Sequence, residues 1–406
     1  MALLTFDVHH HPRRAYITMG LLLALMLAFP FVASQYGNSW VRIIDIALLY
    51  IMLALGLNIV VGFAGLLDLG YIAFFAVGAY LTALFSSPQF AALLESVVYY
   101  SPALGEALVA LFGEEIRTNG IHLSVWAIVP LAGLVAALFG ALLGAPTLKL
   151  RGDYLAIVTL GFGEIIRIFM NNLNDPINFT NGPQGINMID PIRIFGVSLA
   201  GEAGSQSTVY IGSYAMPSVN AYYFLFLFLC IATIFVTSRL QHSRLGRAWV
   251  AIREDEIAAK AMGINTRNVK LLAFSMGASF GGVAGAMFAA FQGFVSPESF
   301  SLTESIAVLA MVVLGGIGHI PGVVLGGVLL AALPEVLRHV VAPAQMALFG
   351  KVVIEAEVLR QLLYGLALVL IMLVRPAGVW PSPNREDRPK AALARDDEMS
   401  EKDAAA

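Results

Sequence analysis

Charged residues are scarce in this chain of 406 residues. Asp, Glu, Lys and Arg make up 13% of it, and hydrophobic residues make up 58%. Soluble domains carry about 25% charged residues, so these few charges could not cover a soluble surface of this size. The shortage excludes a soluble protein and predicts an integral membrane protein.

Cysteine and catalytic motifs are also nearly absent. The single cysteine, Cys230, lies inside an apolar run, which excludes a disulfide framework and a cysteine metal site. The sequence contains no nucleophile–His–acid set, no Walker phosphate-binding motif and no cluster with metal-ligand spacing. His9, His10 and His11 are better explained as a solvated tail than as a metal site. We therefore predict that the chain is not an enzyme and binds no metal or cofactor itself.

Eight apolar runs approach the length of about 20 residues that a membrane-spanning helix needs. They are Tyr16–Ser34, Ile43–Val61, Leu69–Phe85, Val125–Leu148, Tyr154–Met170, Ala221–Ser238, Leu271–Phe291 and Val358–Val374. A further stretch, Ser305–Leu337, is interrupted by Gly315, Gly316, Gly318, Pro321 and Gly322. Its halves look too short to span, so we expect two half-helices or a re-entrant hairpin buried within protein. The predicted fold is an all-α, polytopic bundle of about eight spanning helices with this broken pair.

Loop charge predicts which side of the membrane each loop faces. The loop 239–270 holds seven of the 24 Lys and Arg residues, so it belongs on the cytoplasmic side. Lys149 and Arg151 mark another cytoplasmic loop, whereas the acid-rich loops 86–122 and 171–220 belong outside. Because the basic residues sit in loops beside apolar runs, nucleic-acid binding is not expected.

The same reasoning divides the chain into three parts. Residues 1–15, which include Arg13 and Arg14, form a cytoplasmic tail, and residues 16–375 form the membrane domain. Residues 376–406 are rich in charge and proline, which predicts a disordered cytoplasmic tail. Both termini are thus expected in the cytoplasm.

The basic loop contains a predicted short amphipathic helix, Gly246–Gly263. Small apolar residues recur along it at three- and four-residue steps, and Glu256 and Lys260 are spaced as an i,i+4 ion pair. Gly263 is placed to close the helix in a left-handed cap. The helix could lie on the lipid interface, but interfacial helices prefer Trp, Phe and Leu, whereas small alanines suit close contact with a protein. We favour a helix that docks a soluble partner.

Two charged residues fall inside the predicted span Tyr154–Met170. Glu164 and Arg167 are three residues apart and can neutralise each other. Gly161 and Gly163 precede them and could break the helix. Charged residues within a membrane are costly and are therefore candidates for a functional site. A structural ion pair that locks two helices is an equal alternative.

A second polar candidate is the glycine-punctuated run Leu55–Tyr80, which contains Asn58 and Asp68. Unwinding around Gly62 and Gly65 could expose backbone groups to a substrate, as in the broken helices of transporters. Glycine-mediated helix packing with a helix-end Asp is the simpler alternative and the one we favour.

Several segments resemble the larger of the two paired permeases in bacterial branched-chain amino acid ABC importers. They are "LRGDYLAIVTLGFGEIIRI", "NGPQGI", "GRAWVAIREDEIAAKAMGI", "FQGFVSPESF" and "VLGGIGHIPG", and the resemblance runs from about Leu55 to Pro376. It implies a multi-pass protein of the bacterial inner membrane that conducts leucine, isoleucine or valine inward. It also implies a second homologous permease, two cytoplasmic ATPases that hold ATP-Mg, and a periplasmic amino-acid-binding protein.

The resemblance further implies that the helix in the basic loop couples the permease to an ATPase. The residues that would make this contact are Arg253, Glu254, Asp255, Glu256, Ala258, Ala259 and Gly263. The common importer pattern is Glu-Ala-Ala, three residues and Gly, and here Ile257 occupies the acidic position. The resemblance identifies no substrate-binding side chain, so the pathway candidates are Asn58, Gly62, Gly65, Asp68, Gly161, Gly163, Glu164 and Arg167.

Two alternatives remain open at this point. A permease for urea or short-chain amides looks similar in sequence, although the sequence of Leu150–Ile168 favours an amino-acid permease. An ion-coupled carrier would instead use Glu164 and Asp68 as proton sites and would work without ATPases.

Overall fold

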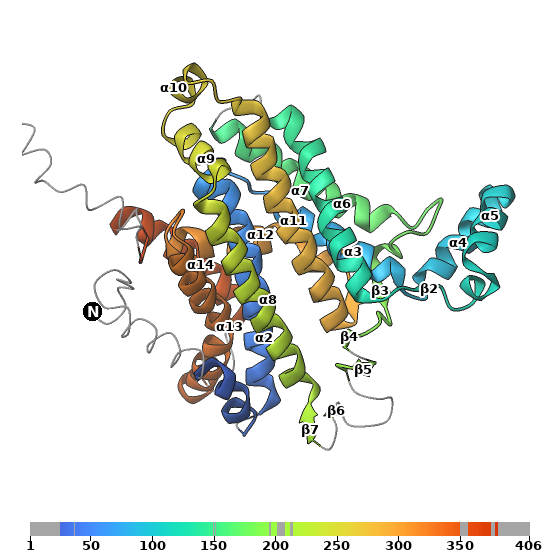
Figure 1. Cartoon of the computed structure of the whole chain (residues 1–406). Coiled ribbons are helices and arrows are strands. Elements are labelled where there is room, and N and C mark those ends of the chain that lie inside the picture. Colours follow the sequence, from blue (N-terminus) through green and yellow to red (C-terminus); the bar gives the residue numbers. More distant parts are fainter. Residues whose placement is uncertain are drawn as a thin grey trace, which may run out of the picture.

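The computed structural model describes residues 25–35, 37–148, 150, 152–194, 196–200, 208–211, 214–349, 356–374 and 378–380. Within these ranges the chain is mostly helical, and its long helices run side by side in one bundle (Figure 1). Five helical segments of this part are long and apolar enough to cross a membrane: Asn38–Phe63, Val125–Thr147, Ser218–Gln241, Thr266–Gln292 and Pro297–Gly315. The fold is that of a polytopic helical membrane protein.

Some helices follow one another closely, whereas α7 and α8 are joined by a long segment that holds η3 and β3 to β7. The long helices are α2 (Asn38–Asn58), which continues as the π-helix η1 (Ile59–Phe63), α3 (Ile72–Phe85), α6 (Val125–Thr147), α7 (Asp153–Asn172), α8 (Ser218–Gln241), α11 (Thr266–Gln292), α12 (Leu302–Gly315), α13 (Ile320–Phe349) and α14 (Ala356–Val374). The shorter helices are α4 (Gln89–Tyr100), α5 (Pro102–Phe112), α9 (Arg244–Glu254), α10 (Glu256–Ala261) and the 3-10 turns η2 (Glu114–Arg117), η3 (Gly182–Gln184) and η4 (Pro297–Phe300). Four antiparallel strand pairs are β1–β2 (Ser86–Ser87 with Ile121–His122), β3–β8 (Ile186–Asn187 with Phe294–Val295), β4–β5 (Arg193–Ile194 with Val197–Ser198) and β6–β7 (Thr208–Ile211 with Tyr214–Pro217).

Each predicted span overlaps a helix where the structure describes it, but Leu69–Tyr71 lie before the start of α3. The first, Tyr16–Ser34, is described only from Leu25, where a helix runs to Gln35. The predicted tails lie outside the described residues except for 378–380, and Lys149 and Arg151 lie outside them as well. Sequence analysis missed α4 and α5, which form a hairpin that projects from the side of the bundle (Figure 1).

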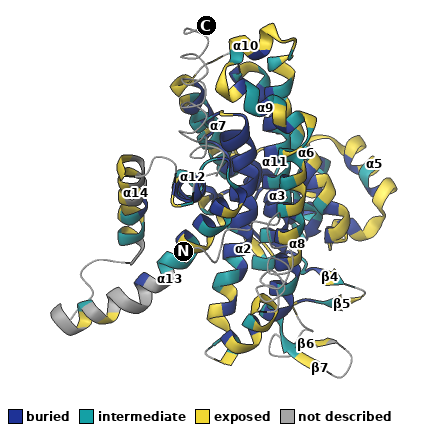
Figure 2. Ribbon diagram, turned by 60° about the vertical axis from the view of Figure 1, so that its left-hand side comes forward, coloured by how far each residue is buried: buried dark blue, intermediate teal, exposed yellow. Residues whose placement is uncertain are grey.

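Helix α11 occupies the centre of the bundle and packs against α2, α3 and α6. Figure 2 shows the buried residues in the middle of the bundle, around α3 and α11. Close approach depends on glycine: a Cβ on Gly78 of α3 would lie 2.6 Å from the Cα of Gly282 on α11. On the opposite side, a Cβ on Gly282 would lie 2.5 Å from the Cβ of Ala136 on α6. Small residues let three backbones meet here, as is common in membrane bundles.

The interrupted stretch is an antiparallel pair, as the hairpin interpretation predicts. Gly315 of α12 lies against Gly322 of α13, and Gly326 lies against Met311. The first half, α12, has 14 residues, but together with η4 it forms the segment Pro297–Gly315, which is long and apolar enough to cross a membrane. The expectation that it is too short to span was therefore wrong. The second half was also predicted wrongly, since α13 has 30 residues and continues past Leu337. Pro321 does not interrupt it, because it lies in the first turn, where a missing N–H costs nothing.

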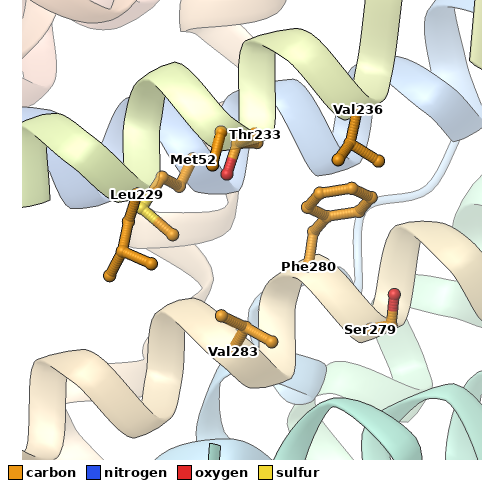
Figure 3. A pocket seen from close by; sticks show the side chains of 8 residues that line it. Met52, Leu229, Thr233, Val236, Ser279, Phe280 and Val283 are labelled. Carbon is orange, nitrogen blue, oxygen red and sulfur yellow. The ribbon is translucent and has the colours of Figure 1, made fainter. Parts of the chain in front are cut away.

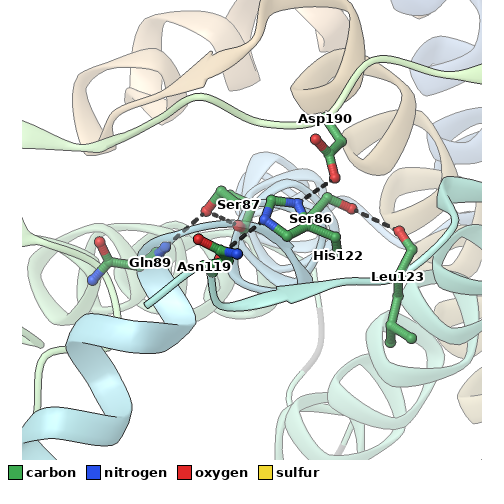
Figure 4. A network of polar contacts seen from close by, with 8 residues as sticks. Ser86, Ser87, Gln89, Asn119, His122, Leu123 and Asp190 are labelled. Carbon is green, nitrogen blue, oxygen red and sulfur yellow. Dashed lines mark hydrogen bonds and ion pairs between the residues drawn. The ribbon is translucent and has the colours of Figure 1, made fainter. Parts of the chain in front are cut away.

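The loops of opposite charge lie at opposite ends of the bundle. Helices α9 and α10 of the basic loop lie at one end, whereas β4 to β7 lie at the other (Figure 1). Near that other end, His122 connects the two acid-rich segments: its Nδ1 lies 2.6 Å from Asp190 Oδ2, and its Nε2 lies 2.7 Å from the carbonyl of Asn119 (Figure 4). The amide of Asp190 also donates to the carbonyl of Ser86 at 2.7 Å. The acid-rich segments therefore form a structured layer rather than loose loops.

Glycine packing at the centre predicts a position-dependent effect of bulk. We expect Gly282→Leu to destabilise the detergent-solubilised protein by at least about 1–3 kcal/mol, since the side chain would be forced into α6. Gly365→Leu on α14 is the control, because a Cβ there meets nothing within 4 Å. The temperature at which each variant loses its monodisperse chromatographic peak measures the effect. Equal stability of the two variants would contradict this account of the core.

Candidate functional site

The basic loop forms two helices, not the single helix Gly246–Gly263 predicted from the sequence. Helix α9 ends at Glu254, and Asp255 is extended, with φ −152° and ψ 109°. Its Oδ1 accepts hydrogen bonds from the amides of Ile257 and Ala258 at 2.8 and 3.0 Å, so it caps α10. An aspartate followed by a glutamate is a recognised signal for a helix start. Sequence analysis missed the break because it followed the apolar spacing alone.

The end of α10 matches its prediction, but its ion pair does not. Gly263 has φ +85°, and the amide of Ile264 donates to the carbonyl of Ala259 at 3.1 Å, as in a left-handed helix cap. Glu256, however, pairs with Lys270 at the start of α11, at 2.7 Å between Oε2 and Nζ. The predicted partner, Lys260, is exposed. The pair therefore fastens α10 to a spanning helix instead of stabilising α10 itself.

The structure divides the coupling candidates into an outward and an inward group. Glu254, Asp255, Ala258 and Gly263 are exposed, whereas Ala259 is 5% exposed and Glu256 turns to Lys270. Two apolar side chains that sequence analysis did not select also face outward. Ile257 is 74% exposed and Met262 is 85% exposed. The signal was present in Ile257, an apolar residue where the importer pattern has an acid.

Arg253 is exposed as well, but its guanidinium turns back to the bundle. Its Nη1 donates to the carbonyl of Gly62, in the π-helix that ends α2. Its aliphatic part lies over Gly65, where a Cβ would be 2.5 Å from Arg253 Cγ. The structure therefore brings together a coupling candidate and two pathway candidates that the sequence had placed in separate groups.

The predicted unwinding after α2 is present between Ala64 and Gly70. Within it, the amide and carbonyl of Leu69 find partners in neighbouring helices. Leu69 donates its amide to Thr159 Oγ1 at 3.1 Å and accepts from Ser305 Oγ at 2.7 Å. Asp68, which is 2% exposed, accepts from the amide of Gly70 at 2.9 Å. These contacts fit the packing and helix-end interpretation, since the backbone bonds are made within the chain.

Asn58 connects the first interruption to the second. Its Oδ1 accepts from the amide of Gly318, in the turn between α12 and α13, at 2.9 Å. Gly62 lies against the same turn, and a Cβ there would be 2.7 Å from the amide nitrogen of Gly318. The two broken regions therefore meet at one place in the bundle.

The charged pair of α7 forms as predicted, but the helix does not break. Arg167 Nε donates to Glu164 Oε2 at 2.8 Å, and α7 is continuous through Gly161 and Gly163. Glu298 of η4, which the sequence did not single out, lies 3.9 Å from Arg167 Nη1. About a third of the Glu164 and Arg167 side chains stays exposed (32% and 29%). Gly161 has open space beside it, whereas Gly163 lies against Gly70.

A pocket of about 170 Å³ lies elsewhere, between α2, α8 and α11 (Figure 3). Its side-chain polar groups are the hydroxyls of Thr233 and Ser279, and its other lining residues are apolar. It contains no charged group that could hold the ammonium or carboxylate of a free amino acid. None of the pathway candidates lines it.

The fold and these interruptions define the class of protein: a polytopic membrane permease. A protein-family profile described as "Branched-chain amino acid transport system / permease component" matches residues 39–372. The chain belongs to this family, and it is a permease component of an ABC transport system rather than an enzyme. No solved structure matches the chain.

Curated relatives agree with this assignment. The high-affinity branched-chain amino acid transport system permease protein LivM of Escherichia coli is 41% identical over 366 residues, which cover 89% of this chain and 73% of the relative. LivM of Salmonella typhimurium is 40% identical, covering 92% of this chain and 77% of the relative. LivH of Escherichia coli, a permease of the same named system, is 32% identical over 161 residues, covering 40% of this chain and 46% of LivH. The match favours branched-chain amino acids over urea or amides, and an ABC permease over an ion-coupled carrier.

The pair on α7 can be tested as a unit. We expect Glu164→Gln and Arg167→Met each to lower the stability of the chain by about 1 kcal/mol, because each leaves a partner without its counter-charge. The amount of protein that accumulates in the membrane should fall accordingly. The double variant should accumulate closer to the wild-type level. Quantitative immunoblotting of membranes measures this. A double variant that accumulates least of the three would refute the structural pair, and one that accumulates normally but fails in uptake would assign the pair to the pathway.

Proposed function

We propose that this chain forms the translocation pathway together with a second, homologous permease, and that the α9–α10 segment receives the force of a cytoplasmic ATPase. The main support for this docking role is the outward face of the segment, which exposes Ile257, Met262 and the capped end at Gly263. Large apolar side chains exposed on a loop of a membrane protein favour a protein partner. ATP-Mg would bind to two ATPase subunits, not to this chain.

Charge and family relationships support the rest of the assembly. The basic loop argues for a cytoplasmic position of α9 and α10, with both termini on the same side and the chain in a bacterial inner membrane. The relatives LivM and LivH are two permeases of one named system, which favours a paired arrangement here. Exposed apolar residues of α7, including Ile165 and Phe169, suit contact with a second permease or lipid. A periplasmic binding protein would deliver the amino acid to the structured external layer.

Removing the apolar face should release the ATPases. We expect Ile257→Asp combined with Met262→Asp to lower recovery of ATPase subunits with the tagged chain by about tenfold or more, since buried apolar anchors dominate interfaces. Met188→Asp is the control, because Met188 is 77% exposed and belongs to the external layer. The measurement is a pull-down from native membranes with the recovered subunits identified by mass spectrometry. Normal ATPase recovery with the double variant would argue against this docking face.

The left-handed cap gives a second test. Gly263→Val should impair uptake while leaving the chain in the membrane, because a β-branched residue at φ +85° costs about 1–2 kcal/mol and deforms the end of α10. A Cβ at Gly263 meets nothing within 4 Å in the chain, so the rest of the bundle is unaffected. Gly263→Asn is the matched control, since Asn tolerates this conformation. Uptake of radiolabelled leucine should fall with Val and persist with Asn. Equal uptake by both variants would show that the cap does not matter for coupling.

A further inference from the structure

The interruption of α2 is held by a residue from the cytoplasmic loop. The last carbonyls of a helix have no partner within the helix, and they carry a partial negative charge. The widened π-turn pairs the amides of Ala64 and Leu66 with the carbonyls of Ile59 and Val60. The carbonyl of Gly62 receives the guanidinium of Arg253, from the last turn of α9. A cation at this position satisfies both the orphan carbonyl and the helix dipole.

The same guanidinium lies beside the second interruption. A Cβ on Gly318, in the α12–α13 turn, would be 3.1 Å from Arg253 Nη1. Gly318 has φ +82° and donates its amide to Asn58, which is fully buried near the end of α2. Arg253 therefore sits where the ends of α2, α12 and α13 meet.

The rest of α9 is fixed to the bundle at a different point. Trp249 is fully buried, and its Nε1 donates to the carbonyl of Val269 on α11 at 2.8 Å. Helix α10 is fastened to the same helix through Glu256 and Lys270. The α9–α10 segment thus contacts α11 at Trp249 and Glu256 and contacts the broken helices at Arg253.

We propose that Arg253 is the positioning residue that transmits displacement of the α9–α10 segment to the two helix interruptions. The inference rests on the proposed coupling role of this segment. It assigns the guanidinium of Arg253, a residue that is exposed overall, to the bundle through Gly62 rather than to an ATPase contact. Glycine at 65 is part of the arrangement, because a side chain there would displace the aliphatic part of the arginine. At 318 glycine suits the φ of +82° and leaves room beside the guanidinium. A charge-assisted bond to a helix end resists displacement better than a neutral one.

If Arg253 only caps the helix end, its loss should have a different effect than if it also transmits movement. Loss of a cap lowers stability, and uptake falls together with ATP turnover as complexes are lost. Loss of transmission leaves the complex assembled and hydrolysing ATP, but less amino acid enters for each ATP consumed. The ratio of uptake to ATP hydrolysis therefore separates the two roles.

The test uses the full complex with its ATPases and second permease, reconstituted in proteoliposomes with the binding protein and leucine. Arg253→Met keeps the aliphatic part over Gly65 but removes the cation. We expect normal ATPase recovery and a ratio about tenfold below wild type, the scale of losing one charge-assisted hydrogen bond. Arg253→Lys should recover part of the ratio, since it restores the charge without the planar fork. Arg247→Gln is the matched control, because Arg247 lies in the same helix and bonds only locally, to the carbonyl of His242 at 3.0 Å.

Each outcome decides the question. A wild-type ratio in a folded Arg253→Met complex overturns the inference. Loss of the ATPases from this variant also overturns it, because Arg253 would then be a docking residue and the proposed function would stand. If wild-type chain recovers no ATPase, the proposed function fails and the inference fails with it. Should Arg253→Met not yield a folded complex, Arg253→Gln replaces it and the same ratio decides.

Discussion

The requirement that every backbone polar group find a partner inside the protein governs this structure. Hydrocarbon offers no hydrogen bonds, so an interrupted helix within a membrane survives only where side chains replace the missing intrahelical bonds. The chain has two such interruptions in its described part, after α2 and between α12 and α13. Asn58, Asp68, Thr159, Ser305 and Arg253 supply the replacement contacts. The arrangement of the helices follows from the need to bring these five side chains to the interruptions.

Glycine is what lets those contacts form at hydrogen-bond distance. Gly62 and Gly318 lie face to face. Position 62 has no room for a side chain, and position 318 has a φ of +82°, which favours glycine. Close packing at glycine also joins α3, α6 and α11, through Gly78 and Gly282. In lipid, apolar burial adds little to helix association, so close backbone packing takes its place. The centre of the bundle is therefore held by shape, and the interruptions are held by specific polar bonds.

Much of this fold follows from apolar run length, and the rest depends on contacts that sequence spacing does not reveal. The long runs predicted the positions of the spanning helices because membrane thickness sets their length. The paired charges Glu164 and Arg167 were recognisable because their spacing places them on one helix face. Glu298 was not, since it reaches Arg167 from a segment over 100 residues away. Lys260 and Lys270 both suit Glu256 chemically, and the break at Asp255 decides between them.

Within the interruption after α2, two parts of the backbone have different partners. Around Leu69 and Gly70, the partners are buried side chains of the bundle itself, Thr159, Ser305 and Asp68. At Gly62, the partner is Arg253, which belongs to a segment at the surface. A bond between two interior groups can change only if the bundle repacks, whereas a bond to a surface segment changes whenever that segment moves. Under the proposed coupling, displacement of the α9–α10 segment would therefore act at Gly62, while the neighbouring unwound residues would keep their geometry.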